Sequence, residues 1–422
     1  MSAERSQKAI ETVWRVESAR LIGGLARITR DIGLAEDLAH EALLAALERW
    51  PHEGIPDNPG AWLMTTGKRR ALDLARRKKI VERKHDELAG DPAYAQPDMD
   101  LDAALDDEVG DDLLRLLFVA CHPVLSVDAR VSLTLRLLGG LTTEEIARAC
   151  LVPEPTIAQR IVRAKRTLTE ARVPFEVPRG AELRTRLEAV LGVIYLIFNE
   201  GYAATRGDDW MRPALVEDAL RLGRILVARI PEEAEAHGLV ALMEIQASRM
   251  RARVGASGEA VLLLDQDRSR WDQLLIRRGL SALDVAERLS QPLGPYTLQA
   301  AIAACHARAR TAHETDWERI VALYDALAEL TQSPVVELNR AVAVSMAMGP
   351  AAGLELADAL MDEPPLRHYH LLPSVRADLL LKLGRSHEAR AEFERAASMT
   401  QNSRERELLL HRARACSGVG SR

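Results

Sequence analysis

One predicted helix carries side chains that could hydrogen-bond to the edges of DNA bases. From Glu154 to Leu168 the apolar residues recur at i, i+4, i+7 and i+11, which makes one buried stripe: Ile157, Ile161, Ala164 and Leu168. The opposite face carries Thr156, Gln159, Arg160, Val162, Arg163 and Arg166. In the major groove, arginine pairs with guanine, glutamine with adenine, and a small apolar group touches a thymine methyl. We therefore predict that this face binds DNA.

The segment before this helix predicts a helix-turn-helix. Thr142 caps a short helix whose first turn is acidic, at Glu144 and Glu145, which suits the positive end of the helix dipole. The sequence from Leu151 to Pro153 then turns the chain into the second helix. An ordinary helical hairpin with a solvated basic face is the alternative, but cap, turn, apolar stripe and polar face together favour DNA recognition.

A second basic helix is predicted upstream, from Pro59 to about Arg83. Between Lys68 and Lys84 it has nine lysines and arginines against two acids. We predict an inward stripe of Met64, Gly67, Ala71 and Leu74. Arginines on the other face are placed for phosphates along a strand. Taken alone such a run is more often a solvated face, but its place upstream of a second DNA-binding unit favours nucleic acid.

The loop before this helix could hold an unstacked base. Pro51 to Gly60 is rich in proline and glycine, and Trp62 follows one residue later. Single strands are held by stacking on aromatic rings and by pockets for flipped bases. The candidate strand-binding residues are Asn58, Trp62, Arg69, Arg70, Arg76 and Arg77.

Charge is sorted along the first 172 residues, although the whole chain is net acidic at −6. An acidic segment lies between the two basic helices, with nine acids and no lysine or arginine from Asp91 to Asp112. This order predicts two separate contacts with a polyanion, joined by a tether that polyanions repel.

The composition predicts an almost wholly helical protein. Its 422 residues are 47 % hydrophobic and only 4 % aromatic, and the length suits two to four domains. The polar N-terminus and the lack of a run of about 18 apolar residues predict a cytoplasmic protein with no membrane segment. The four cysteines form no CxxC pair, so we expect reduced thiols and no metal site.

The C-terminal part shows an internal repeat. Val344–Leu354 and Leu379–Ala389 are similar at an offset of 35 residues, with the small-residue rhythm of tetratricopeptide helix pairs. We therefore predict an all-α fold with two small helical DNA-binding domains and a large helical, tetratricopeptide-like C-terminal domain. The predicted segments are 1–90, an acidic linker at 91–112, the helix-turn-helix domain at 113–174, a helical extension at 175–310 and repeats at 311–422.

Three stretches together resemble the extracytoplasmic-function group of bacterial sigma factors, the promoter-recognition subunits of RNA polymerase. Gly33–Ala46 resembles the helix that those factors dock on the polymerase β′ clamp, Pro59–Arg77 resembles region 2, which opens the minus-ten element, and Gly140–Leu168 resembles the region 4 reader of the minus-thirty-five element. His40 stands where glutamine is common, and Gly67-Lys68-Arg69 replaces the frequent Ala-Arg-Asn. The resemblance implies that core polymerase is bound by Glu36, Asp37, His40, Glu41 and Leu44.

Beyond Arg179 the chain resembles a subgroup with a long tetratricopeptide-like extension. Ile197–Tyr202, Leu264–Asp272, Gly294–Ile302 and Pro334–Ala343 carry that similarity. Several polar or aromatic residues interrupt these otherwise apolar helices: Asn199, Glu200, Arg268, Arg270 and Trp271. They indicate either a groove for a ligand or protein, or buried salt bridges between helices. We favour the second interpretation, in which they are packing residues. A regulatory partner or ligand on the extension is our hypothesis.

The resemblance implies a factor that joins the polymerase β and β′ subunits to promoter DNA. Each reading unit is weak alone, so promoter affinity appears only when the polymerase fixes their separation. The acidic tether would pass through the positively lined RNA path of the polymerase, or would merely keep the chain soluble; both interpretations have equal support.

Two other functional classes, a conventional transcriptional regulator and an enzyme, account for parts of the sequence. A conventional helix-turn-helix regulator with a tetratricopeptide-like sensor explains the chain from Gly140 onward but leaves Gly33 to Arg77 without a role. An enzyme is disfavoured, because Cys121-His122, Cys305-His306 and His368-Tyr369-His370 match no recognised catalytic or metal spacing. We expect no catalytic residue, no metal ligand and no cofactor.

Overall fold

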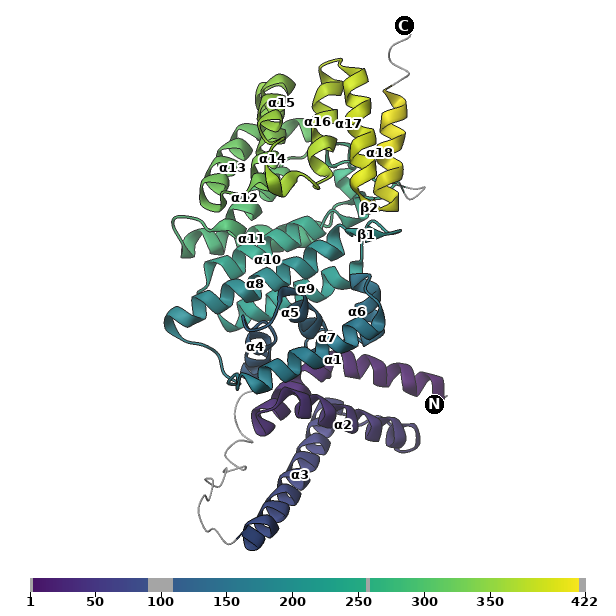
Figure 1. The fold of residues 1–422 in the computed structure, drawn as a ribbon, viewed down its shortest axis with the longest axis vertical. Coiled ribbons are helices and arrows are strands. Elements are labelled where there is room, and N and C mark those ends of the chain that lie inside the picture. The colour runs from purple at the N-terminus through teal and green to yellow at the C-terminus, as the bar shows by residue number, and fades with distance from the viewer. Residues whose placement is uncertain (1–2, 90–108, 256–258, 417–422) are drawn as a thin grey trace. The chain divides into compact units, whose positions relative to one another are not determined.

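The computed structural model describes residues 3–89, 109–255 and 259–416, and its architecture is all-α, as predicted (Figure 1). It divides into two compact units, Met1–Val193 (unit 1) and Ile194–Arg422 (unit 2). Within these described ranges, none of the helices has the length and apolar character needed to cross a bilayer.

In the described residues of unit 1 there are seven helices and the first part of an eighth. They are α1 (Ala3–Thr29), α2 (Ile32–Glu53), α3 (Pro59–Ala89), α4 (Val109–Ala120), α5 (Val127–Leu137), α6 (Thr143–Cys150), α7 (Glu154–Glu170) and α8 (Gly180–Tyr202). The predicted turn at Leu151 to Pro153 is confirmed, since it falls between α6 and α7, and the helices also break at His122-Pro123 and Gly139-Gly140. Most of the predicted acidic linker lies outside the described residues, and our domain boundaries stay predictions.

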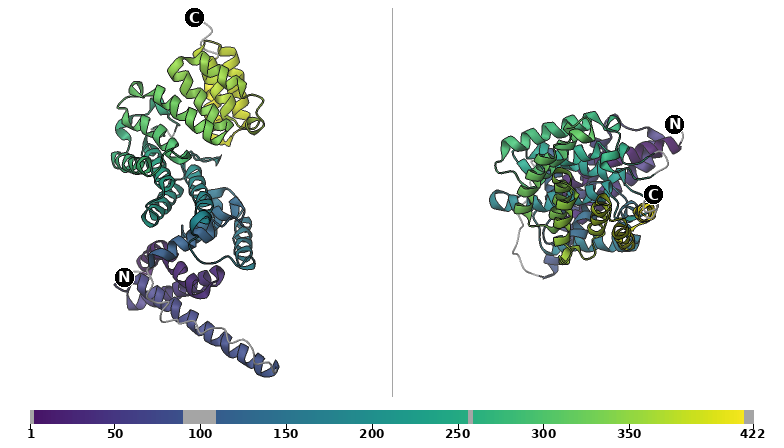
Figure 2. Two further views of the ribbon diagram at one scale, coloured as in Figure 1. Left: turned by 90° about the vertical axis from the view of Figure 1, so that its left-hand side faces the viewer. Right: turned by 90° about the horizontal axis from the view of Figure 1, so that it is seen from above.

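Helix α3 departs from the prediction in its inward stripe. Leu63 is fully buried although it was not predicted, and Leu74 is 39 % exposed. Gly67 and Ala71 are buried as expected, and the half-buried Met64 packs against Gly24 of α1. The helix also runs on to Ala89, beyond the predicted end. Figure 2 shows α3 extending as one straight rod past the helices that it packs against. Leu74 lies near the start of this free length, where fewer neighbouring side chains cover it, and it is therefore partly exposed.

Unit 2 continues with helices and one very short strand pair. The α-helices are α9 (Pro213–Arg229), α10 (Ala234–Ala247), α11 (Gln273–Leu289), α12 (Pro295–Arg308), α13 (Trp317–Thr331), α14 (Pro334–Met348), α15 (Pro350–Ala359), α16 (Leu371–Lys382), α17 (Ser386–Met399) and α18 (Ser403–Ala415). The 3₁₀ turns are η2 (Met250–Ala252), η3 (Leu263–Asp265), η4 (Arg268–Arg270), η5 (Ala312–Glu314) and η6 (Pro364–Leu366). Strands β1 (Arg206–Gly207) and β2 (Gln401–Asn402) pair in parallel.

The late helices pack as successive pairs, α14 with α15 and α16 with α17, and α18 then lies beside α17 (Figure 1). Phe393 of α17 is fully buried in the core that these helices share. Gly353 lets α15 approach α14 closely, because a Cβ there would lie 2.7 Å from the Ala341 carbonyl oxygen. Short connections and small contact residues are what the 35-residue repeat predicted.

Asn402 joins the beginning and the end of unit 2. Its Nδ2 donates to the carbonyl oxygens of Ala204 at 2.9 Å and Asp209 at 3.0 Å, and its Oδ1 accepts from the Glu405 backbone N–H at 3.1 Å. The side chain is 2 % exposed. It therefore caps α18 and also satisfies two carbonyls of the loop after α8.

We predict that Asn402→Ala lowers the free energy of unfolding of unit 2 by about 2–4 kcal/mol, because the cap is lost and two carbonyls lose their donor. Urea unfolding followed by tryptophan fluorescence measures this. Gln401→Ala is the matched control, since Gln401 is exposed on the adjacent position. Equal losses in the two variants would contradict the role of the Asn402 side chain.

Candidate nucleic-acid interface

The helix-turn-helix is built by α6 and α7. Thr142 and Glu145 form a capping box, with the Glu145 N–H donating to Thr142 Oγ1 at 3.1 Å and the Thr142 N–H donating to Glu145 Oε2 at 2.8 Å. Leu151 takes a left-handed conformation at φ 50° and turns the chain. The four predicted stripe residues of α7 are all buried: Ile157, Ile161, Ala164 and Leu168. Their burial fixes which face of α7 is left for a partner.

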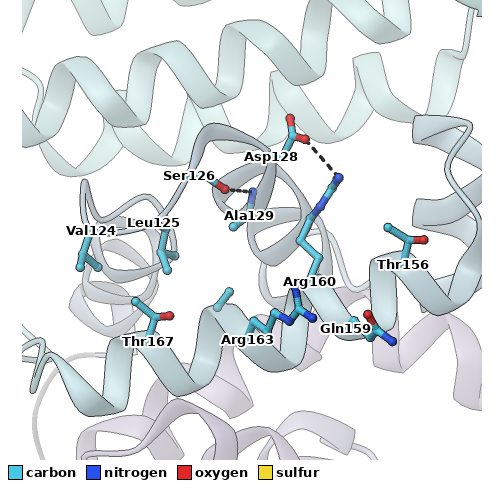
Figure 3. Close-up of a pocket in the computed structure, with 11 residues that line it drawn as sticks. Val124, Leu125, Ser126, Asp128, Ala129, Thr156, Gln159, Arg160, Arg163 and Thr167 are labelled. Atoms are coloured by element: carbon cyan, nitrogen blue, oxygen red, sulfur yellow. Dashed lines mark hydrogen bonds and ion pairs between the residues drawn. The ribbon is translucent and has the colours of Figure 1, made fainter.

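That free face borders a hollow of about 430 Å³ (Figure 3). Its walls include four of the predicted base-reading residues: Thr156, Gln159, Arg160 and Arg163. The start of α5 forms the facing wall, where Asp128 pairs with Arg160 at 3.1 Å. The carboxylate therefore orients one guanidinium and leaves Arg163 exposed beside it.

The other two predicted residues of α7 lie outside the lining of this hollow. Val162 is 65 % exposed. Arg166 is also exposed and pairs with Glu170 one turn later at 2.6 Å. On the face of α7 that is left free, the exposed valine can contact a thymine methyl in the major groove.

Three of the predicted strand-binding residues share one face of α3. Trp62, Arg69 and Arg76 are seven residues apart, so they lie along one line of the helix at intervals of about 10 Å. Arg69 and Arg76 are exposed. Trp62 packs edge-on against the buried Trp50, with ring centroids 5.3 Å apart. The side chain of Arg77 lies outside the described residues.

The remaining two predicted residues near α3 have structural partners. Asn58 Oδ1 accepts from the Ala61 N–H at 3.0 Å and so caps the helix. Arg70 pairs with Glu41 of α2 at 2.6 Å. These contacts hold the loop and the first turns of α3 in place for Trp62.

Glu36 of α2 is buried against α5 and α7. It is 3 % exposed, pairs with Arg136 at 2.7 Å and also pairs with Lys165. Burial alone would raise the pKa of the Glu36 carboxyl, but Lys165 and Arg136 outweigh it and lower the pKa from its ordinary 4.5. The contact thus joins the first three helices to the helix-turn-helix.

Two further ion pairs lie at the same junction in unit 1. Arg15 of α1 pairs with Glu145 at 2.7 Å, and Arg27 pairs with the buried Asp112 at 3.2 Å. Burial raises the pKa of Asp112 despite the neighbouring arginines. Burial also raises the pKa of Glu145, but its bonds to Thr142 and Arg15 lower that pKa overall.

Two stretches match models of sigma-70 regions. Residues 16–80 match sigma-70 region 2, and residues 115–168 match sigma-70 region 4. The chain is 30 % identical over 172 residues to a probable extracytoplasmic-function sigma factor, SigI, of Mycobacterium tuberculosis, and covers 57 % of that protein with 40 % of its own length. It is 29 % identical over 153 residues to the sigma factor SigK of Mycobacterium ulcerans, covering 78 % of SigK with 35 % of itself.

The chain belongs to the extracytoplasmic-function sigma factors. The extension of this sigma factor matches a family of unknown function (DUF6596) over residues 186–287. A protein of Rhizobium meliloti named uncharacterized protein R00370 is 43 % identical over 390 residues, which is 91 % of the sigma factor and 90 % of that protein.

The predicted polymerase-docking residues of the sigma factor separate into two groups. Asp37, Glu41 and Leu44 are exposed at i, i+4 and i+7 on one face of α2. Leu34 and Leu47, which the sequence interpretation missed, are also exposed, at 39 % and 37 %. Their signal was position, because they fall outside the buried alanine-rich stripe of α2. Glu36 and His40 instead face region 4.

His40 lies at the contact between α2 and region 4. Its ring lies against Trp14 with centroids 5.3 Å apart, and Nε2 lies 3.1 Å from an Arg136 nitrogen. Burial, with Arg136 and Lys165, lowers the pKa of His40 from 6.5, although Glu36 acts to raise it. Only a neutral imidazole can accept the hydrogen bond of Arg136.

The cysteine and histidine motifs bring together no metal-binding group within the residues that the structure describes. The Cys121 thiol is buried, which raises its pKa to about 12, and it shares a hydrogen bond with Thr134 at 3.4 Å. A thiol in this state is a poor nucleophile and a poor metal ligand.

We predict that acid loosens the contact between regions 2 and 4. His40 has a lower pKa when packed than when released, so its contribution is complete above pH 6.5 and is lost as the pH falls below that value. Hydrogen exchange of α2 and α5, corrected for the intrinsic pH dependence of exchange, should quicken between pH 7 and pH 5. His40→Gln should remove this step.

The matched control is His52→Gln, an exposed histidine of the same helix, which should keep the wild-type response. A step that survives in His40→Gln would show that another group controls the contact.

Proposed function

We propose that this sigma factor binds core RNA polymerase through α2, captures the minus-ten strand with α3 and reads the minus-thirty-five duplex with α7. It acts by binding, without a catalytic residue, in the cytoplasm where it meets polymerase. The observation that carries the proposal is the division of each helix into two faces. In α2 the buried stripe leaves acidic residues and leucines exposed, and in α7 it leaves polar residues exposed. In α3 it leaves Arg69 and Arg76 exposed, on the same line of the helix as the half-buried Trp62.

Region 2 and region 4, which bind the two promoter elements, must separate to engage a promoter. In unit 1 they are joined through the Glu36, Arg136 and Lys165 contact. The two promoter elements are about 25 base pairs apart, which is roughly 80 Å of duplex at about 3.4 Å per pair. Packed helices cannot span that length. The closed arrangement therefore belongs to the free factor, and polymerase supplies the energy and the spacing for the open one.

We predict that Arg163→Ala weakens discrimination at one position of the minus-thirty-five element by about 10- to 100-fold, the range for one guanine-reading side chain. In vitro transcription with core polymerase over a promoter library measures both activity and consensus. Arg172→Ala is the control, because it removes the same charge from an exposed position just beyond α7.

The Arg172 variant should lower yield slightly and equally across the library. If Arg163→Ala behaved in the same way, Arg163 would be a phosphate contact. If the wild-type chain started no transcript with core polymerase, the proposed mechanism would fall.

The extension is proposed to regulate the sigma factor. Two facts support this. The extension is fused to region 4 through α8, whose Arg186 is buried and donates to the Phe118 carbonyl oxygen at 3.0 Å. It is also built of paired helices, an architecture that commonly presents binding surfaces.

We predict that truncation after Val193, at the boundary between the two units, changes transcript yield severalfold while polymerase binding persists. A cut at Arg179 would instead remove the Arg186 contact of unit 1. Circular dichroism and co-elution with core polymerase are the controls for folding and binding. If the truncated factor gave the same transcript yield as the full-length factor, under each growth condition that changes the activity of the full-length factor, the extension would have no regulatory role.

A further inference from the structure

Three arginines of unit 2 are linked through two aromatic rings. The Arg253 guanidinium lies 3.8 Å from the Tyr202 ring centroid, and Arg268 lies 4.8 Å from that of Trp271. Arg249 lies between them, 5.9 Å from each ring. We call this group the arginine cluster. It includes two of the residues, Arg268 and Trp271, that the sequence marked as either a ligand groove or buried salt bridges.

The salt-bridge interpretation holds elsewhere in the extension but not here. Glu200 pairs with Arg212, as packing predicts. Among the residues that the structure describes, no carboxylate pairs with Arg249, Arg253 or Arg268. Buried guanidinium groups normally require such a partner.

Backbone carbonyls account for two of the three arginines. Arg253 donates to the Tyr202 carbonyl oxygen at the end of α8. Arg268 donates to the carbonyl oxygens of His306 at 2.5 Å and Ala309 at 2.8 Å, at the end of α12. Helix C-termini carry partial negative charge, so these sites stabilise two cations in part.

Arg249 has no such compensation. It is 9 % exposed and donates to the neutral Gln246 side chain, and its Nε has no partner. Two other buried groups of the cluster also lack partners, Trp271 Nε1 and His306 Nδ1, in side chains that are 4 % and 8 % exposed. The unsatisfied N–H groups of Arg249 and Trp271, beside a cation that has no carboxylate partner, are donors of the kind that an anion needs.

The neighbouring groups respond to this excess of positive charge. Burial, Arg249 and Arg268 together lower the pKa of His306 to about 4. Burial and Arg249 also lower the pKa values of Arg253 and Arg268, although Tyr202 acts to raise the first and Glu314 the second. Each cation therefore makes the others less favourable while no anion is present.

We propose that the arginine cluster binds a small anion bearing a phosphoryl or carboxylate group, with Arg249 as its main partner. Arginine presents a planar fork that matches both groups. A protein surface does not fit, because Arg249, Trp271 and His306 are each at least nine-tenths buried. This proposal names a ligand for the regulatory role proposed above. Only the effect of the anion on transcription rests on that role, because anion binding is measured separately.

The test uses the full-length chain with inorganic phosphate and, in a second arm, citrate, each against sodium chloride at equal ionic strength. Thermal unfolding and isothermal titration calorimetry report binding. We expect phosphate or citrate to raise the unfolding temperature of the wild type and of Arg251→Gln, and Arg249→Gln to weaken the response at least tenfold. Arg251 is the matched control because it is exposed between Arg249 and Arg253.

A purely structural arginine gives the opposite pattern. Without added anion, Arg249→Gln should be at least as stable as the wild type, because an uncompensated buried charge has been removed. Loss of stability that is independent of anion would overturn the proposal, as would equal anion responses in all three proteins or no response in any. Binding with unchanged transcription would leave the site standing and refute the regulatory role.

Discussion

The arrangement of unit 1 depends on one buried carboxylate. Glu36 lies where α2, α5 and α7 meet, and it satisfies two cations from region 4, Arg136 and Lys165. A buried charge is tolerated only when it is paired, and removing one partner is far more unfavourable than removing both. Such a contact is therefore either fully formed or fully broken, because a half-formed contact would leave a buried charge without a partner. This is a suitable property for a junction that must hold two DNA readers together in one state and release them in another.

The extension shows the converse electrostatic situation. Glu36 has more than one cation, whereas in the arginine cluster three cations form no ion pair with a carboxylate of the described part of the chain, and Glu314 acts on Arg268 only from beyond ion-pair distance. Helix C-termini and aromatic rings compensate in part, at about 0.5–2 kcal/mol for each favourable contact. The charge of Glu36 is therefore balanced within the chain, whereas the charge of the arginine cluster is balanced by a bound anion in our proposal. That difference assigns a structural role to the first and a ligand-binding role to the second.

Periodicity and local capping made most of the fold predictable from sequence. The α7 stripe, the Thr142 cap and the turn at Leu151 to Pro153 depend on residues within a few positions of each other, and all are confirmed. The burial of Glu36 was not predictable, because its partner Arg136 is 100 residues away in the chain. The exposure of Leu74 was missed for a related reason, since periodicity does not say where neighbouring helices end. Arg249 gave only a weak signal, an arginine at every second position after an apolar helix.

The helix shared by the two units gives the extension a physical route to the DNA readers. Helix α8 contributes Arg186 to the packing of region 4 in unit 1 and ends in unit 2 at Tyr202, whose ring and carbonyl hold Arg253. A ligand shifts an equilibrium only through a difference in its affinity for the two states. Occupancy of the arginine cluster would alter promoter reading only if the end of α8 differs between the closed and open factor. The relevant comparison is therefore the anion affinity of the free factor and of the polymerase-bound factor, because linkage requires that an anion favouring one state binds that state more tightly.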